Sequence, residues 1–148
     1  MWCGKFLALP LIAACLPAMA VLGEPAAQVQ ADQIRLQASR SITPGVWERH
    51  TLRLADGSEI TQWAQPGGGK VVAIEWRTHF KPRLDELLGR YFAAYQLAAQ
   101  AGRRGTPTAN RHLMLQAGDL VVENQERLQV YTGRAYLASA VNLRGAAQ

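Results

Sequence analysis

Cysteine is nearly absent from this 148-residue chain, and both copies lie close to the N-terminus. Cys3 and Cys15 fall within the first twenty residues, so the rest of the chain can form neither a disulfide nor a thiolate metal site. If that first segment is removed, the domain has to fold on its hydrophobic core alone. A chain of this size can do so, because it buries roughly two thirds of the surface that it exposes when unfolded.

Long apolar runs are missing as well, except at the start of the chain. Residues 6–16 are apolar, Lys5 precedes them, and Ala18-Met19-Ala20 provides the small side chains that signal peptidase requires. These features predict a signal peptide over residues 1–20 with cleavage after Ala20. The protein is therefore predicted to be periplasmic or secreted.

Two alternatives to this signal peptide remain open. The apolar run is nearly long enough for a membrane anchor, although Pro10 and Pro17 interrupt it. Ile12-Ala13-Ala14-Cys15 is similar to a lipoprotein box, but no polar tether follows the cysteine. Cleavage after Ala20 is the preferred interpretation, and it leaves residues 21–148 as a single domain with no stable membrane anchor.

Signatures of catalysis and cofactor binding are also lacking. The histidines His50, His79 and His112 show no metal-ligand spacing, and no HExxH motif occurs. No serine lies in a GxSxG nucleophile elbow. The stretch Pro66-Gly67-Gly68-Gly69-Lys70 lacks the GK[ST] ending of a phosphate-binding loop and is interpreted as a hairpin turn. The sequence therefore predicts no cofactor and no metal.

The excess of positive charge is small. Lysine and arginine number 16 against 11 aspartates and glutamates, which gives a formal net charge of +5. This excess is spread along the chain, so it is compatible with acidic lipid or polymer surfaces without requiring them. Export argues against nucleic acid as a partner.

Short apolar runs bounded by turn residues predict five strands. The predicted strands cover residues 46–54, 58–64, 70–76, 119–123 and 127–137. The first three form an antiparallel meander, and the last two form a C-terminal hairpin around Asn124-Gln125-Glu126.

The first predicted hairpin also has a predicted register. Ala55-Asp56-Gly57 suits a three-residue loop with glycine in the left-handed conformation. This loop places Arg53 opposite Glu59, whereas a two-residue loop would place Leu54 opposite Glu59 on one face. The three-residue loop is preferred, and it puts tryptophans and arginines on one face of the hairpin and aliphatic side chains on the other.

Two helices complete the predicted fold. Residues 26–39 form a short amphipathic helix, and residues 82–101 form a long one that begins near Pro82 and ends at Gly102. Gly89 lies just outside the apolar stripe of the long helix, which predicts the close approach of another segment. The fold class is a single α+β domain: a three-stranded meander plus a C-terminal hairpin, one long helix packed on the sheet, and a short N-terminal helix.

Several stretches carry a family resemblance. They are Val21-Leu22-Gly23, LRLADGSEITQW, VVAIEW, LDELLGRYFAAY and DLVVENQ followed by GRAYL. Through these stretches the chain resembles the uncharacterised bacterial envelope proteins of domain-of-unknown-function family 2844. The resemblance implies a secreted or periplasmic domain without an assigned activity.

One predicted strand face is a candidate binding surface. It carries Trp47, Arg49, Arg53 and Trp63, and the register sets Trp63 opposite Arg49 in a position for a cation–π contact. Exposed tryptophans would mark a partner or ligand surface. The alternative is that the first helix or the C-terminal tail covers this face.

Two other groups are weaker candidates. Arg103, Arg104 and Arg111 make a basic loop that could contact an anionic surface. Glu48 and His50 point to the predicted core side of their strand, where a carboxylate and an imidazole could provide acid and base groups. We expect a non-catalytic exported envelope module that binds a protein or an anionic cell-surface component. The alternative is a small envelope enzyme, hydrolytic or metal-dependent, that uses Glu48 and His50.

Overall fold

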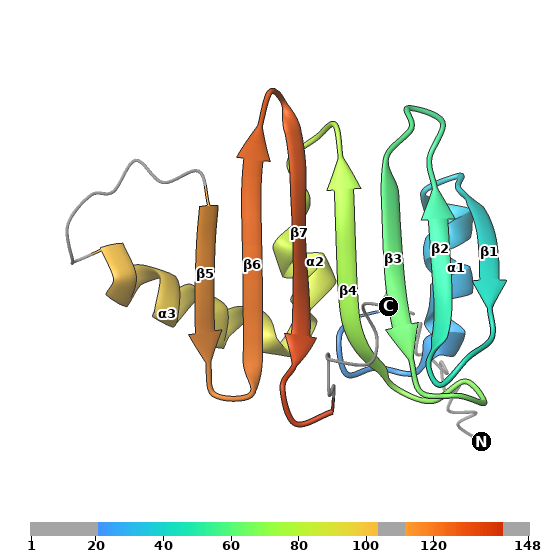
Figure 1. Cartoon of the computed structure of the whole chain (residues 1–148), viewed down its shortest axis with the longest axis horizontal. Helices are drawn as coiled ribbons and strands as arrows, with labels where there is room; N and C mark the ends of the chain where they lie inside the picture. The colour runs from blue at the N-terminus through green and yellow to red at the C-terminus, as the bar shows by residue number, and fades with distance from the viewer. Residues whose placement is uncertain (1–20, 104–111, 141–148) are drawn as a thin grey trace, which may run out of the picture.

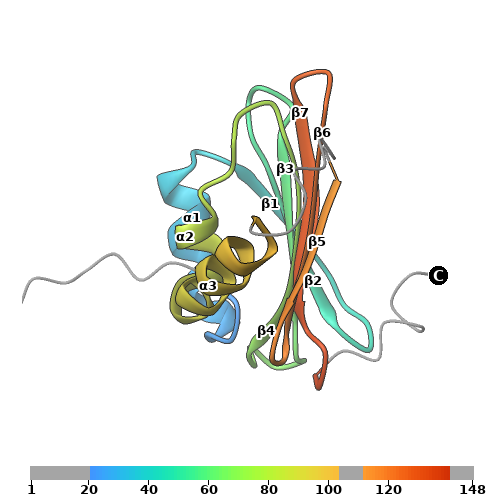
Figure 2. The same cartoon turned by 90° about the vertical axis from the view of Figure 1, so that its left-hand side faces the viewer.

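The computed structural model describes residues 21–103 and 112–140, which form one antiparallel sheet of seven strands with helices on one side (Figures 1 and 2). The strand order is β1-β2-β3-β4-β7-β6-β5. The strands are β1 (Ser39–Thr43), β2 (Glu48–Arg53), β3 (Glu59–Ala64), β4 (Val71–Thr78), β5 (His112–Ala117), β6 (Leu120–Arg127) and β7 (Val130–Leu137). The helices are η1 (Ala26–Gln28), α1 (Val29–Arg35), α2 (Leu84–Leu88), η2 (Gly89–Tyr91) and α3 (Phe92–Arg103). The predicted signal peptide, residues 1–20, lies outside the described residues.

The prediction of a three-stranded meander plus a hairpin is wrong, because the sheet has a further strand at each edge. β1 forms one edge and β5 the other. β1 lies where the sequence predicts the end of a helix and a loop, since the N-terminal helix α1 already ends at Arg35. Four of the five β1 residues are exposed, so no buried alternation identifies this strand in the sequence.

The C-terminal hairpin is longer than predicted, and its turn lies elsewhere. β6 pairs with β7 as far as Arg127 and Val130, which leaves Leu128-Gln129 as a two-residue turn. Both turn residues have positive φ angles, 50° and 63°, as a type I′ turn requires. Asparagine and glycine usually fill such a turn. The predicted turn at Asn124-Gln125-Glu126 is therefore wrong, and those residues are paired within β6.

The prediction of one long helix is also wrong, because Gly89 divides it into α2 and α3. The φ of 47° and ψ of −118° at Gly89 do not fit a helix. They match the first central position of a type II′ turn, where glycine is preferred. A Cβ at this position would also collide with the side chain of Val21. Glycine is thus required both by the backbone conformation and by the N-terminal segment that passes here.

This N-terminal segment connects α2 to the sheet. The Leu22 N–H donates a hydrogen bond to the Leu87 carbonyl at 3.1 Å, and the Gly23 N–H donates to the Val71 carbonyl at 2.8 Å. Leu22 is fully buried. The expectation that another segment approaches Gly89 closely is confirmed.

The predicted β2–β3 hairpin is confirmed in its register and its loop. Arg53 lies opposite Glu59, and the Leu54 N–H donates to the Ser58 carbonyl at 2.9 Å across a three-residue loop. Gly57 has a φ of 81°, as the left-handed position of this loop requires. The Asp56 carboxylate accepts hydrogen bonds from the backbone N–H and the hydroxyl of Ser58, which lower its pKa below the ordinary value.

The hydrophobic core lies between the sheet and the helices. All three α-helices cover the same face of the sheet (Figure 2). Side chains from this face pack against α2 and the N-terminal segment. The fully buried apolar side chains include Leu22, Leu52, Ile74, Leu88, Leu120 and Val122. Among the described residues no helix lies on the other face, which we call the open face.

Candidate functional site on the open face of the sheet

The open face carries three rows of side chains that lie opposite one another on adjacent strands. The rows are Arg53, Glu59, Arg77, Thr132 and Gln125; Thr51, Thr61, Glu75, Arg134 and Glu123; and Arg49, Trp63, Ala73, Tyr136 and Val121. Arg127 follows Gln125 by two residues on β6 and faces the same way, because residues two apart on a strand share a face. Arginines therefore outnumber glutamates on the open face, which gives it an excess of positive charge.

Four of the predicted binding residues lie at the β2–β3 side of this face, but only three of them lie together. Trp47, Arg49 and Trp63 form what we call the tryptophan patch, whereas Arg53 lies four residues further along β2, opposite Glu59. The Arg49 guanidinium carbon lies 5.7 Å from the centroid of the Trp63 ring, so the predicted cation–π contact is confirmed. Trp47 and Trp63 are both half-buried, and they pack with Tyr136 against a small apolar cluster of Val72 and Ala73. This packing fixes the rings while leaving part of each accessible.

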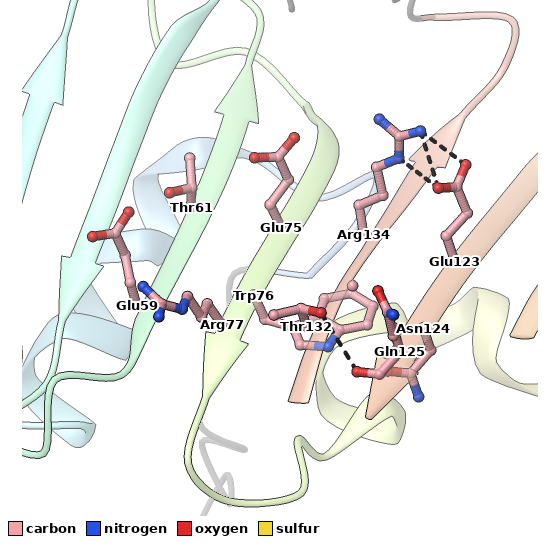
Figure 3. Close-up of a pocket in the computed structure, with 11 residues that line it drawn as sticks. Glu59, Thr61, Glu75, Trp76, Arg77, Glu123, Asn124, Gln125, Thr132 and Arg134 are labelled. Atoms are coloured by element: carbon pink, nitrogen blue, oxygen red, sulfur yellow. Dashed lines mark hydrogen bonds and ion pairs between the residues drawn. The ribbon is translucent and has the colours of Figure 1, made fainter. Parts of the chain in front are cut away.

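Two arginines of the open face are bound to carboxylates. Arg53 Nε lies 2.9 Å from Glu59 Oε2, and Arg134 makes two hydrogen bonds of 3.0 Å to the Glu123 carboxylate (Figure 3). The hydrogen bonds to Glu123 raise the pKa of Arg134 above its ordinary value. Arg134 also lies over the Tyr136 ring, at 5.8 Å from its centroid.

A hollow of about 320 Å³ lies between these charged side chains (Figure 3). Short side chains and a glycine, including Thr61, Thr132 and Gly133, leave room above the strands. Longer charged side chains from four strands surround it, and three of them, Glu59, Glu75 and Glu123, are carboxylates. The other two are arginines, so the lining of the larger hollow has three carboxylates against two guanidinium groups, although the face as a whole is basic.

A second hollow of about 280 Å³ lies beside the first, towards the β6–β7 turn. It is lined by Arg77, Gln125, Arg127, Leu128, Val130 and Thr132, and we call it the arginine hollow. Its lining has two guanidinium groups and no carboxylate. Thr132 and Gln125 are linked, because the Thr132 hydroxyl donates to the Gln125 carbonyl at 3.5 Å. Of the two hollows, the arginine hollow has the more positively charged lining.

The predicted Glu48 and His50 pair lies on the opposite side of the sheet, beneath α1. Glu48 Oε2 is 3.4 Å from His50 Nε2, and Arg40 Nη2 is 3.0 Å from His50 Nδ1. A guanidinium can only donate, so Nδ1 accepts and the proton of the neutral ring sits on Nε2, facing Glu48. Burial, with only 3% of the residue exposed, and then the charge of Arg40 lower the pKa of His50.

Glu48 is fixed from a second side by the glycine-rich turn. The Gly67 N–H donates to Glu48 Oε1 at 3.0 Å, and this bond lowers the pKa of the carboxyl below its ordinary value. The neighbouring Gln62 lies opposite His50 on β3, and its amide donates to Asp32 of α1 at 3.5 Å. The arrangement connects the glycine-rich turn, three strands and α1, so these groups hold the edge of the core together.

The remaining predicted site residues are only partly visible. Arg103 is the last residue of α3, while its side chain, Arg104 and Arg111 lie outside the described residues. Sequence reasoning missed Arg77 and Arg127, although Arg77 lies between two buried residues, Trp76 and Thr78, on its strand. They come together through the pairing of β7 with both β4 and β6, which the sequence does not reveal.

Two further features of the described part of the chain bear on function. No three histidine, cysteine, aspartate or glutamate side chains within residues 21–103 and 112–140 are placed to hold a metal ion. No helix in these same ranges combines the length and the apolar character needed to cross a membrane.

Comparison with known families identifies the relatives of this chain. The DUF2844 family, described as proteins of unknown function, matches residues 18–143. The chain belongs to this family. The predicted resemblance is thereby confirmed. No curated protein and no solved structure matches the chain.

In this DUF2844 protein, two of the stretches that carry the resemblance contact each other. Arg90 Nη2 donates to the Gly23 carbonyl at 3.5 Å, and a Cβ at Gly23 would lie only 2.7 Å from the same atom. Arg90 also lies over the Tyr91 ring, at 5.2 Å from its centroid. These stretches therefore connect the N-terminal segment to the helices, and they lie on the side of the sheet opposite the tryptophan patch.

Proposed function

We propose that this DUF2844 protein is a non-catalytic exported module that binds an acidic polymer of the cell envelope through the open face of its sheet. The main observation in support is the open face itself, on which five arginines and half-buried aromatic rings lie in ordered rows, with no helix of the described residues covering them. Such a face attracts negatively charged partners and holds them by charge-assisted hydrogen bonds.

The envelope location in this proposal comes from the first twenty residues. Their charged start, apolar run and Ala18-Met19-Ala20 site have the pattern of a signal peptide. The chain from Val21 onwards supports cleavage there, because Leu22 and Gly23 are buried and hydrogen-bonded within the fold. A folded domain that starts at this point needs no part of the preceding segment for the contacts described above.

The chemistry of the open face favours an acidic polymer over a folded protein partner. Protein interfaces are depleted of charge at their centres. Here the middle row has Glu75 and Arg134 side by side near its centre, and Glu123 follows at its end. An extended polymer can place its acidic groups beside the arginines and leave the glutamates in water, whereas a close-packed protein interface would have to bury both.

The enzyme alternative has less support. A carboxylate and an imidazole do lie together at Glu48 and His50. However, His50 is buried beneath α1, both of its ring nitrogens face charged side chains of the protein, and neither hollow described above is lined by this pair. A general base needs to reach the proton that it abstracts from a substrate.

The test compares binding of the purified protein to envelope material before and after protease treatment. We expect binding to survive protease treatment and to weaken as salt is raised, because exposed charge interactions are screened. The double variant Trp47→Ala with Trp63→Ala should bind more weakly, while the control Phe80→Ala, which removes an exposed aromatic elsewhere, should bind as the parent does. Loss of binding after protease treatment would show instead that the partner is a protein.

A further inference from the structure

We propose that the arginine hollow is an oxyanion-binding site that takes a carboxylate or phosphate group of the acidic polymer. This inference rests on the proposed function and names the groups that would hold the charge. Arg77 and Arg127 provide the guanidinium groups, and Gln125 and Thr132 lie between them on the hollow surface. None of these residues belongs to the tryptophan patch.

The arginines of the open face divide into two kinds. Arg53 and Arg134 are bound to carboxylates, and Arg49 lies over Trp63. Within the described part of the chain, no carboxylate lies within ion-pair distance of Arg77 or Arg127. Glu59 lies opposite Arg77, but its carboxylate is bound by Arg53.

Arg77 and Arg127 share one concave surface. The arginine hollow, about 280 Å³ in volume, is lined by both of them and by no acidic residue. A guanidinium presents its donors as a planar fork that matches the oxygens of a carboxylate or phosphate. Two such forks across one hollow can bind a single oxyanion from two sides.

The neighbouring hollow orients the ligand. It is lined by three carboxylates and two guanidinium groups, whereas the arginine hollow has two guanidinium groups and no carboxylate, so an anionic group is attracted towards the β6–β7 turn. The chain of the polymer would cross the larger hollow with its neutral or hydroxyl-bearing part. The two hollows share Arg77, Gln125 and Thr132, which makes them one continuous polar trough.

The separation between the tryptophan patch and the arginine hollow determines how long a ligand must be to contact both. Trp63 and Glu59 are four residues apart on β3, which places the row of Trp63 about 13 Å along the strands from the row of Arg77. Adjacent strands add about 5 Å for each strand crossed. A single small anion cannot contact both the tryptophan patch and the arginine hollow, whereas an extended polymer can.

The experiment measures the affinity of the full-length purified protein for two acidic polymers and one neutral one. A polyuronate provides carboxylates, polyphosphate provides phosphates, and dextran is the neutral probe. The test variant is Arg77→Gln with Arg127→Gln. The matched control is Lys70→Gln with Lys81→Gln, which removes the same charge from two exposed lysines outside the hollow.

We expect the arginine variant to lose at least about tenfold in affinity for the preferred acidic polymer, since each arginine makes charge-assisted hydrogen bonds. The slope of log affinity against log salt should also fall by about one for each arginine that no longer binds an anionic group. The lysine control should lose less than the arginine variant by both measures. Which of the two polymers the parent prefers identifies the oxyanion as carboxylate or phosphate.

The two proposals fail in different ways. If the parent binds an acidic polymer and the arginine variant binds it equally well, or no more weakly than the lysine control does, the arginine hollow is not the site. That result would leave the proposed function standing. If the parent binds neither acidic polymer more tightly than dextran, the acidic-polymer function itself is overturned, and the site with it.

Discussion

The two faces of this sheet are built from the same strands but carry different chemistry. On the helix side, aliphatic side chains and the N-terminal segment form the core: Leu22 and Leu88 are fully buried in one cluster, and Val21 lies against Gly89. On the open face, the same alternation produces rows of charged and aromatic side chains. Stability should therefore depend on the helix side and binding on the open face, so substitutions can alter each of them separately.

The largest effect on stability should come from Leu22→Ala on the helix side. Removing a fully buried leucine side chain should lower the free energy of unfolding by about 3–5 kcal/mol, because apolar burial is reduced and a cavity remains. Urea unfolding measures this loss in the free energy of unfolding. The control Ile34→Ala, at a residue 72% exposed, should change stability by less than about 0.5 kcal/mol. Equal losses in both variants would contradict the assignment of the N-terminal segment to the core.

Gly89→Ala should have the next largest effect. Its positive φ and the collision with Val21 together should cost about 2–4 kcal/mol. Gly57→Ala is the matched control, because Gly57 also has a positive φ but a Cβ there would meet nothing within 4 Å. The control should lose only about 1–2 kcal/mol. A difference near zero between the two variants would mean that the contact with Val21 does not matter.

A third, smaller effect should appear as a dependence of stability on pH. The pKa of His50 is lowered in the folded protein from its ordinary value of 6.5, so the unfolded chain binds a proton more readily. The stabilising contribution is therefore complete above about pH 6.5 and is lost as the pH falls below it. Melting temperatures measured from about pH 8 to pH 5 should fall, and His50→Gln should remove that part of the fall.

The carboxylates provide an internal check on this assignment. Glu48 and Asp56 have lowered pKa values, so their contributions are lost at still lower pH, below the ordinary carboxyl range. His50→Gln should leave the Asp56 part of that later loss unchanged, because the pKa of Asp56 is lowered mainly by Ser58, whereas His50 helps to lower the pKa of Glu48. If the variant keeps the full fall between neutral and mildly acidic pH, the titrating group is not His50.

The smallest effect should come from the open face. Glu123→Gln removes the carboxylate that binds Arg134, yet the pair is partly exposed, with 43% of the Arg134 side chain accessible. The loss in stability should be below about 1 kcal/mol and should shrink further in high salt. Urea unfolding at two salt concentrations measures it. A loss as large as that of Leu22→Ala would overturn the separation of the two faces.

The parts of the fold that were predictable have strong local signals. The β2–β3 hairpin combines alternation with a glycine that its loop requires, so its register follows from side-chain chemistry over a few residues. The break at Gly89 was only half visible. The residue indicated a close contact, but the side chain that approaches it belongs to Val21, which lies far away in the sequence.

The edge strands and the β6–β7 turn had no strong local signal in the sequence. β1 is exposed along nearly its whole length, and the β6–β7 turn uses Leu128 and Gln129 in conformations that other residues normally provide. The residues of the candidate site likewise differ in whether the sequence could predict that they lie together. The tryptophan patch follows from one hairpin, whereas Arg77 and Arg127 meet only because β7 lies between their strands.

That strand order also has a consequence for how the chain folds. β1 to β4 pair in sequence, and β5 to β7 pair in sequence, so each half can form from neighbouring segments. The pairing of β4 with β7 must close a long intervening loop, so it should form more slowly than the pairing of strands that are neighbours in the sequence. The N-terminal segment then needs both β4 and α2 in place before it can bind Val71 and Leu87. The segment at Leu22 and Gly23, although it precedes every strand in the sequence, is thus among the last to reach its native position.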